Sequence, residues 1–196
     1  MFDSGATKNE TFYNYNKSES IVPMMSRNTY YNYIHDDRLK ASVIELPYLG
    51  DISMYILLPD ERYDLNRIIQ KATHNQLKEL IESMSSADIE LQFPKFEYSA
   101  SIDLLQTLPK LGVDIRQVLR PLDKQLIVSS ASHEAKIKVH ESGTEAAAVT
   151  IYQFIRIRPG LPTIKIPIKV DHPFAYIIRD NKSKINLFAG VVNKIN

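Results

Sequence analysis

The chain has 196 residues, a formal net charge of +1, 24% charged residues and no cysteine. The lack of cysteine excludes disulfides, thiolate metal sites and cysteine nucleophiles, and the balanced charge gives no case for a nucleic-acid partner. The first ten residues lack the apolar run of a targeting sequence, and no window approaches the ~20 apolar residues that cross a membrane. We therefore expect a globular protein with a sizeable core and neither a nucleic-acid nor a membrane partner.

The first sixty residues predict β-strands. Residues 1–33, rich in Tyr, Asn, Ser and Thr, indicate a long hairpin or a sheet edge in which Pro23 ends one strand. Residues 39–58 indicate a β-hairpin, because an apolar run leads up to Pro47 and 52–58 is apolar enough for a buried central strand.

Two amphipathic helices are predicted next. Asp64 is positioned to cap the first, whose apolar stripe comprises Leu65, Ile68, Ile69 and Ala72. Thr73 and Gln76 form a capping-box pattern ahead of the second, whose stripe comprises Leu77, Leu80, Ile81 and Met84. We expect both helices to lie on a sheet, since their polar faces are not strongly basic.

A strand and a short helix follow. Residues 89–93 alternate between apolar and polar and predict a strand. Ser101 is expected to cap a short helix over 102–108, which Pro109 breaks and Gly112 ends.

Residues 133–150 join a strand to a run of small residues. Ala135 to Val139 alternate as in a half-buried strand. The three successive Ala after Glu145 favour a helical turn by composition alone. The β-prone residues and the Pro and Gly breakers over 151–162 count against that interpretation and favour a strand that has not yet entered its sheet.

The two faces of such a strand would differ. One would carry Thr144, Ala146, Ala148 and Thr150, and the other Glu145, Ala147 and Val149. If the first face meets the core, its small side chains could enter without displacing packed neighbours. Gly143 would serve as the hinge, because glycine reaches backbone angles that other residues avoid.

The C-terminal residues give the clearest strand signal. Residues 164–169 alternate Ile with Lys, 174–178 are continuously apolar, and 187–192 predict another buried strand after a polar turn at 179–183. We expect an α+β fold with a few helices segregated on one side of antiparallel sheets.

Several motifs together resemble one protein family. The segment from Glu141 to Thr150, ESGTEAAAVT, closely resembles the hinge of the reactive loop of serpins, the serine protease inhibitors. Blocks similar to other serpin segments occur in the family's order: VPMM at 22–25, IELPY at 44–48, SMYILLP at 53–59, FPKF at 93–96, HPF at 172–174 with Arg179 and Asp180, and LFAGVVN at 187–193.

The resemblance implies that residues 1–196 form a single partial serpin domain, its C-terminal half, with an exposed reactive loop at about 141–162. The partners implied are a target serine protease and the missing N-terminal half of the domain. It also implies suicide inhibition, in which the protease cuts the loop and the cut loop enters the main sheet before deacylation.

The resemblance also assigns roles to individual residues. The hinge would comprise Glu141, Gly143, Thr144, Glu145, Ala146, Ala147, Ala148 and Thr150. His133 matches a serpin histidine in the breach and shutter region, which opens to admit the loop. We expect a core histidine with a hydrogen-bonded ring, and the resemblance implies that the partner of this ring lies in the missing half.

The reactive bond has two candidate positions. Counting the usual serpin interval from Glu141 places Ile157 before the cut, whereas counting back from the HPF block places Arg156 there. The bond is therefore Arg156–Ile157 or Ile157–Arg158, and we favour the first because a trypsin-like pocket accepts Arg. The alternative is that these arginines only keep a loop soluble.

Other classes of function have weaker support. The chain lacks a Gly-x-Ser-x-Gly elbow and a phosphate-binding loop, and its five His have no metal-ligand spacing, so we expect no enzyme, metal or cofactor. A non-inhibitory serpin-fold binding protein and an inactive truncated fragment remain alternatives. Asn9, Asn16 and Asn181 fit the N-glycosylation pattern and favour an extracellular, secreted glycoprotein, with a cytoplasmic location as the alternative.

Overall fold

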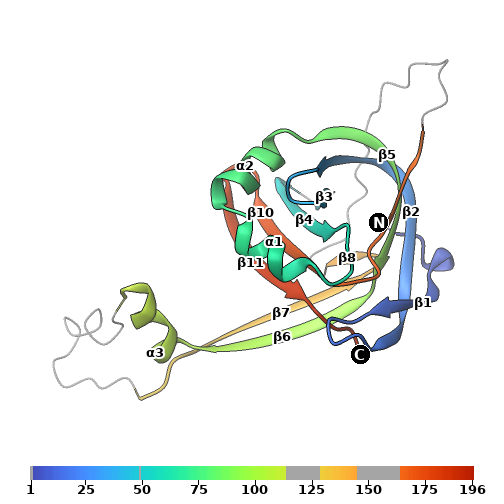
Figure 1. Ribbon diagram of the computed structural model, residues 1–196. Coiled ribbons are helices and arrows are strands. Elements are labelled where there is room, and N and C mark those ends of the chain that lie inside the picture. The colour runs from blue at the N-terminus through green and yellow to red at the C-terminus, as the bar shows by residue number, and fades with distance from the viewer. Residues whose placement is uncertain (1, 49, 114–128, 145–163) are drawn as a thin grey trace. The chain divides into compact units, whose positions relative to one another are not determined.

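The structure is a computed structural model that describes residues 2–48, 50–113, 129–144 and 164–196 (Figure 1). Internal contacts divide the chain into two compact units, Met1–Phe96 with Val139–Asn196, and Glu97–Lys138. The first unit holds the large sheet and the two amphipathic helices that the sequence predicts.

An eight-stranded sheet forms the first unit, in the order β11-β10-β4-β3-β2-β5-β9 with β1 paired to β2 (Figure 1). Its strands are β1 Lys8–Tyr13, β2 Glu19–Asp36, β3 Ala41–Pro47, β4 Ile52–Pro59, β5 Ser85–Pro94, β9 Ile166–Lys169, β10 Phe174–Asp180 and β11 Ile185–Val192. Neighbours run antiparallel, as predicted, with the exception of β5 and β9, which are parallel. That exception arises because β9 reaches β5 by a long connection instead of a hairpin.

The sheet curls around large apolar side chains. The rings of Phe93 on β5 and Phe174 on β10 lie 5.6 Å apart, although three strands separate β5 from β10 in the sheet order. Phe96 packs on both rings, at 6.0 Å from Phe93 and 5.8 Å from Phe174. This aromatic cluster closes the inside of the curl, where each strand places every second side chain.

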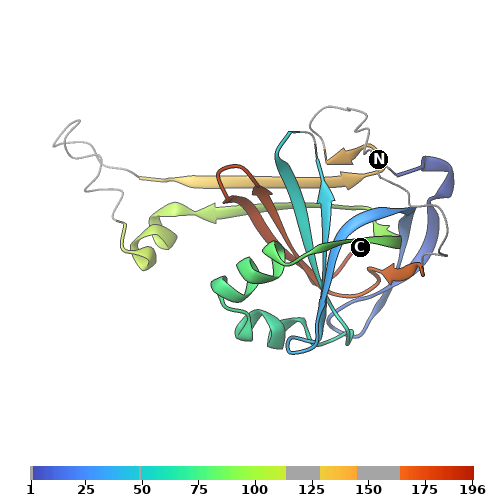
Figure 2. The same ribbon diagram turned by 90° about the horizontal axis from the view of Figure 1, so that it is seen from above.

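Two helices, α1 Leu65–Lys71 and α2 His74–Glu82, pack on the other face of the sheet (Figures 1 and 2). The predicted capping box is confirmed: Gln76 N donates to Thr73 Oγ1 and Thr73 N donates to Gln76 Oε1. Asp64 occupies the predicted N-cap position of α1, but its side chain makes no capping bond, and its carboxylate instead accepts from Arg67 Nε at 2.7 Å. No helix among the described residues is long and apolar enough to span a membrane.

Pro23 does not end a strand, contrary to the prediction, since it lies inside the 18-residue β2. Its carbonyl accepts from Lys95 N at 2.8 Å, on the side of β2 that faces β5. The absent N–H of a proline points to the same side as its carbonyl, and the β5 pairing begins only at Met24. Pro23 therefore gives up only one ladder hydrogen bond, the return bond to Lys95 O at the end of the β2–β5 ladder.

The second unit contains most of β6 Phe96–Asp103 and β7 Ser132–His140, with helix α3 Leu104–Thr107 and a 3-10 turn at Leu108–Leu111. Ser101 lies in β6, so the prediction that it caps the helix is wrong. Asp103 is the cap, because its carboxylate accepts from Leu105 N at 2.9 Å and from Gln106 N at 3.2 Å. Gly112 ends the turn at φ 80°, as predicted.

The prediction that 187–192 is a buried strand is also wrong. β11 is the outermost strand of the path, and Leu187, Phe188 and Val191 are 47%, 45% and 42% exposed. Among the described strands, β11 pairs with β10 alone, along its inner edge. Packing requires the glycine of β11 at position 190. A Cβ at Gly190 would lie 2.5 Å from Cζ of Tyr176, whose ring packs over this position.

Candidate functional site: the hinge after strand β7

β7 leads directly into the predicted hinge. Its predicted alternation is confirmed at Ile137 and Val139, which are both 6% exposed. After a turn at Glu141 and Ser142, the short strand β8 Gly143–Thr144 runs back antiparallel to β7 (Figure 1). In this register Thr144 is opposite Val139 and Gly143 is opposite His140.

Glu141 is held from three sides at the turn. Lys95 Nζ lies 2.9 Å from one carboxylate oxygen and 3.1 Å from the other, and Thr7 Oγ1 donates to Oε1 at 2.9 Å. The main-chain oxygen of Glu141 accepts from Phe2 N at 2.9 Å. We call Glu141, Lys95, Thr7 and Phe2 the hinge clasp.

The charge of Glu141 is stabilised by this arrangement. The hydrogen bond from Lys95 is the main reason that the pKa of Glu141 falls from 4.5 to about 2, and the Thr7 hydroxyl contributes in the same direction. The side chains of Glu141 and Lys95 are 17% and 35% exposed. The carboxylate therefore stays ionised at neutral pH and anchors the turn.

Aromatic packing positions the clasp. Lys95 joins β5 to β6, between Phe93 and Phe96, whose rings are buried. Phe2 stacks on Phe93 with the ring centroids 6.5 Å apart, which places its backbone N–H at Glu141. Lys95 could have been noticed from the sequence, because it is the only charged residue in the FPKF block. Thr7 and Phe2 lie in no recognisable local pattern.

The predicted site residues are only partly within the described residues. Glu141, Gly143 and Thr144 are placed in the β7–β8 turn and ladder. Glu145, Ala146, Ala147, Ala148 and Thr150 of the hinge and Arg156, Ile157 and Arg158 of the reactive bond lie outside the described residues. Their roles remain predictions.

His133 is exposed on β7, so the expectation of a core histidine is wrong for this chain. It shares a strand face with Ile137 and Val139, but burial on that face decreases toward the start of β7. Its proposed part in admitting the loop is untested.

The three predicted glycosylation sites differ in accessibility. Asn9 is exposed on β1 and Asn16 is exposed in the turn between β1 and β2. Asn181 is partly buried, its Nδ2 donates to Ser53 Oγ at 2.9 Å, and its Oδ1 accepts from Tyr55 OH at 2.8 Å. The amide nitrogen that a glycan would use is therefore already engaged at Asn181.

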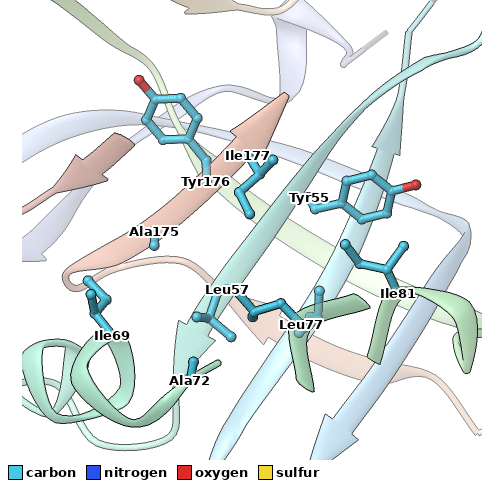
Figure 3. A pocket seen from close by; sticks show the side chains of 10 residues that line it. Tyr55, Leu57, Ile69, Ala72, Leu77, Ile81, Ala175, Tyr176 and Ile177 are labelled. Atoms are coloured by element: carbon cyan, nitrogen blue, oxygen red, sulfur yellow. The ribbon is translucent and has the colours of Figure 1, made fainter. Parts of the chain in front are cut away.

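A separate apolar pocket lies between the helices and the sheet (Figure 3). It has a volume of about 110 Å³, and its lining includes Leu57, Ile69, Leu77, Ile81, Ala175 and Ile177. Tyr55 also lines it, and burial raises the pKa of this phenol to about 12, so it is neutral at physiological pH. The pocket and the hinge are formed by different strands.

The curled mixed sheet and the helices that cover it form an α+β fold of the serpin type. The family model described as Serpin (serine protease inhibitor) matches residues 1–195, and the chain belongs to the serpin family. Relatives of this family include protease inhibitors by name, such as the leukocyte elastase inhibitor of Bos taurus, which is 36% identical over 94% of this chain and 52% of its own length.

Two further proteins illustrate the likeness. Iripin-8 of Ixodes ricinus is 32% identical over 99% of this chain and 50% of its own length. The crystal structure of human thyroxine-binding globulin with its hormone matches with a TM-score of 0.80 and 25% identity, over 100% of this chain and 52% of that one. The chain thus spans about half the length of the curated relatives it matches.

Proposed function

We propose that this chain is the C-terminal half of an inhibitory serpin that traps a trypsin-like serine protease by inserting its cleaved loop. The observation that carries the proposal is the pairing of β8 with β7: Gly143 and Thr144 already run back along the strand that precedes them. Extending this two-residue ladder is the addition of a strand to a sheet, which satisfies main-chain hydrogen bonds residue by residue.

The register explains the small residues of the hinge. If the pairing of Thr144 with Val139 continues, Ala146 falls opposite Ile137 and Ala148 opposite Ala135. Ile137 and Val139 are buried, so the residues beside them must fit against core side chains. The residues on this face of the hinge are all small enough to fit there: Thr144, Ala146, Ala148 and Thr150.

The chemistry requires only the loop from this chain. The catalytic serine of the protease attacks the carbonyl carbon of Arg156, the bond to the Ile157 nitrogen breaks, and an acyl-enzyme forms. Loop insertion then moves the enzyme away before water can cleave the ester. The uninserted loop is metastable, and a kinetic barrier holds it in place. The hinge clasp at Glu141 fixes the point from which insertion starts.

A pair of hinge variants tests insertion. The chain is joined in one polypeptide to the half of leukocyte elastase inhibitor that it does not match, incubated with trypsin and run on a denaturing gel. Thr144→Arg places a charge on the core face and should convert the inhibitor into a substrate, whereas Ala147→Arg, on the opposite face, should still give an SDS-stable adduct. Equal trapping by both variants would contradict insertion in this register.

The reactive bond is tested by mass spectrometry of the same reaction. We expect cleavage after Arg156, loss of the adduct in Arg156→Ala, and retention of the adduct in Arg158→Ala. Cleavage after Ile157 would overturn both the bond and the trypsin-like target, and cleavage after Arg158 would overturn the bond alone.

The pocket supports a second candidate, a small-molecule carrier. Ile177 lines the pocket, and Arg179 follows on the same strand face with a buried Nε that has no hydrogen-bond partner among the described residues. An apolar body bearing a carboxylate fits this pair, and the relative crystallised with thyroxine binds such a molecule. Calorimetric titration with thyroxine tests it: binding that Ile177→Trp abolishes supports a carrier, and absence of heat excludes thyroxine.

Secretion is proposed on the exposed acceptors Asn9 and Asn16. Expression through a secretory pathway followed by glycosidase treatment should remove mass from Asn9 or Asn16 and none from Asn181, because the amide of Asn181 is hydrogen-bonded inside the fold.

A further inference from the structure

The turn between β1 and β2, residues 14–18, is closed by its own hydrogen bonds. Asn14 N donates to Ser18 O at 2.8 Å, and Lys17 N donates to Asn14 O at 2.9 Å. The side chain of Asn14 is fully buried, and its Nδ2 donates to Ser18 Oγ at 3.0 Å. Asn16 is therefore an exposed residue on a turn whose backbone is fixed on both sides of it.

The contacts of Asn16 use its side-chain oxygen. Oδ1 accepts from Ser18 N at 3.1 Å and from Ser18 Oγ at 2.7 Å. Neither bond uses Nδ2, the atom that carries the glycan in the Asn-x-Ser acceptor pattern. At Asn181, by contrast, Nδ2 donates to Ser53 Oγ. The hydrogen bonds of the turn thus leave the acceptor atom of Asn16 accessible for glycosylation.

Two exposed tyrosine rings flank this acceptor. Tyr15, the preceding residue, is 46% exposed, and its hydroxyl accepts from Nδ2 of Asn66 on α1 at 3.1 Å. Tyr63, in the loop before α1, is 43% exposed, and Nζ of Lys17 lies 5.9 Å from the centre of its ring. One ring therefore belongs to the residue before Asn16, and the other contacts the residue after it. We call Tyr15 and Tyr63 the ring platform.

The surroundings of the ring platform restrict what can cover it. Arg62 lies over the neighbouring ring of Tyr13 at 3.5 Å, so that ring already has a partner. Lys17 is exposed, and 5.9 Å is near the outer limit of a cation–π contact, so its long side chain can move aside. An apolar protein partner would have to remove water from Lys17 and Arg62. A sugar covers a ring with the C–H groups of one face and keeps its hydroxyls hydrated, so the chemistry of this surface favours a sugar.

We propose that the first sugar of an N-linked glycan on Asn16 packs on the ring platform and stabilises the fold. In the attachment, Nδ2 of Asn16 forms a bond to C1 of N-acetylglucosamine and gives up one proton to the transferase. The bond from C1 to the oxygen of a polyprenyl-diphosphate donor breaks, and the diphosphate leaves. The source of the sugar rests on the proposed secretion, but the packing depends only on the ring platform, so the two can fail independently. Because the turn is fixed before the sugar is attached, little conformational freedom is lost when the sugar packs.

Asn9 is an exposed acceptor that lacks such a platform. It lies on β1 opposite Pro23, and Thr11 follows on the same strand face. The nearest aromatic residue along β1, Phe12, is fully buried. A sugar on Asn9 finds no ring among these neighbours and should leave the stability unchanged.

The absence of cysteine allows a sugar to be attached at one chosen position without a secretory host. In the 196-residue chain, Asn16→Cys is alkylated either with the iodoacetamide derivative of N-acetylglucosamine or with iodoacetamide itself, and Asn9→Cys is treated in the same two ways. In urea denaturation, the sugar at position 16 should raise the midpoint by about 0.2–0.5 M over the plain alkyl group. The sugar at position 9 should not change it. Combining Tyr15→Leu with Tyr63→Leu should abolish the gain at position 16.

Proton NMR of the same samples, made with an isotope-labelled sugar, reports the packing without relying on stability. Sugar protons at position 16 should shift upfield through the ring currents of the two tyrosines, and the shift should disappear in the double Leu variant. The midpoints of the chains treated with iodoacetamide alone check that each variant folds, since all the substituted side chains are exposed.

The ring platform is refuted if the sugar at position 16 leaves the midpoint unchanged, if both positions gain equally, or if the gain survives the loss of both rings. Sugar protons without an upfield shift would refute it even where the midpoint rises. A chain that receives no glycan in a secretory host would contradict the proposed secretion and leave the ring platform intact.

Discussion

The hinge clasp offers a direct test through Glu141→Gln, which removes the charge and keeps the shape. A fall in pKa from 4.5 to about 2 corresponds to an upper limit of about 3.4 kcal/mol, at 1.36 kcal/mol per pKa unit. Lys95 is 35% exposed, so solvent screening reduces the contribution, and we expect a loss of about 1–2 kcal/mol in the free energy of unfolding at pH 7.

The stabilisation by Glu141 should depend on pH in a defined direction. Because the folded state lowers the pKa of Glu141, its contribution is complete above pH 4.5 and is lost as the pH falls toward about 2. Urea denaturation of parent and variant should therefore differ at neutral pH and converge in acid. Glu97→Gln is the control. Glu97 also has a lysine partner, Lys136 at 2.7 Å, but the two side chains are 48% and 65% exposed, respectively. Because solvent screens this pair, Glu97→Gln should change stability less than Glu141→Gln. Equal midpoints for parent and Glu141→Gln at pH 7, or a difference that persists at pH 2, would refute the reasoning.

Three further substitutions test the packing, each by urea denaturation. Gly190→Ala should lower the free energy of unfolding by about 1–3 kcal/mol, because the new Cβ would clash with the Tyr176 ring. Adding Tyr176→Ala should recover part of this loss. If the double variant recovers nothing, the clash is not the cause. Thr73→Ala removes the capping box of α2 and should cost about 1 kcal/mol, and an unchanged midpoint would show that α2 needs no cap. Asn14→Ala should lower the free energy of unfolding by about 2–3 kcal/mol, because it leaves the buried Ile195 N–H without its acceptor. A smaller loss of stability than for Thr73→Ala would contradict this explanation.

Local patterns in the sequence predicted the elements whose causes are local. The capping box of α2 and the hairpin of β3 and β4 depend on residues a few positions apart, and both are present. The Pro23 prediction failed because the effect of a proline in a strand depends on where the partner strand begins. Here that partner is β5, about seventy residues away.

At the candidate site, too, features with local causes could be predicted and features that depend on distant residues could not. The alternation of β7 followed from periodicity, whereas the clasp joins Thr7 to Glu141 across 134 residues. No local window contains both. β11 was misjudged for a related reason: an apolar run predicts that something covers the strand, but the run itself does not say whether the cover belongs to the same stretch of chain.

The parallel pairing of β5 with β9 has a consequence for synthesis on the ribosome. Residues 85–94 emerge well before residues 166–169, so the outer edge of β5 stays open while the intervening chain is made. During that interval Leu91 and Gln92 lack their eventual neighbours Ile168 and Lys169. A nascent chain stalled between these two points would present an unpaired strand, which is a target for chaperones and a starting point for aggregation.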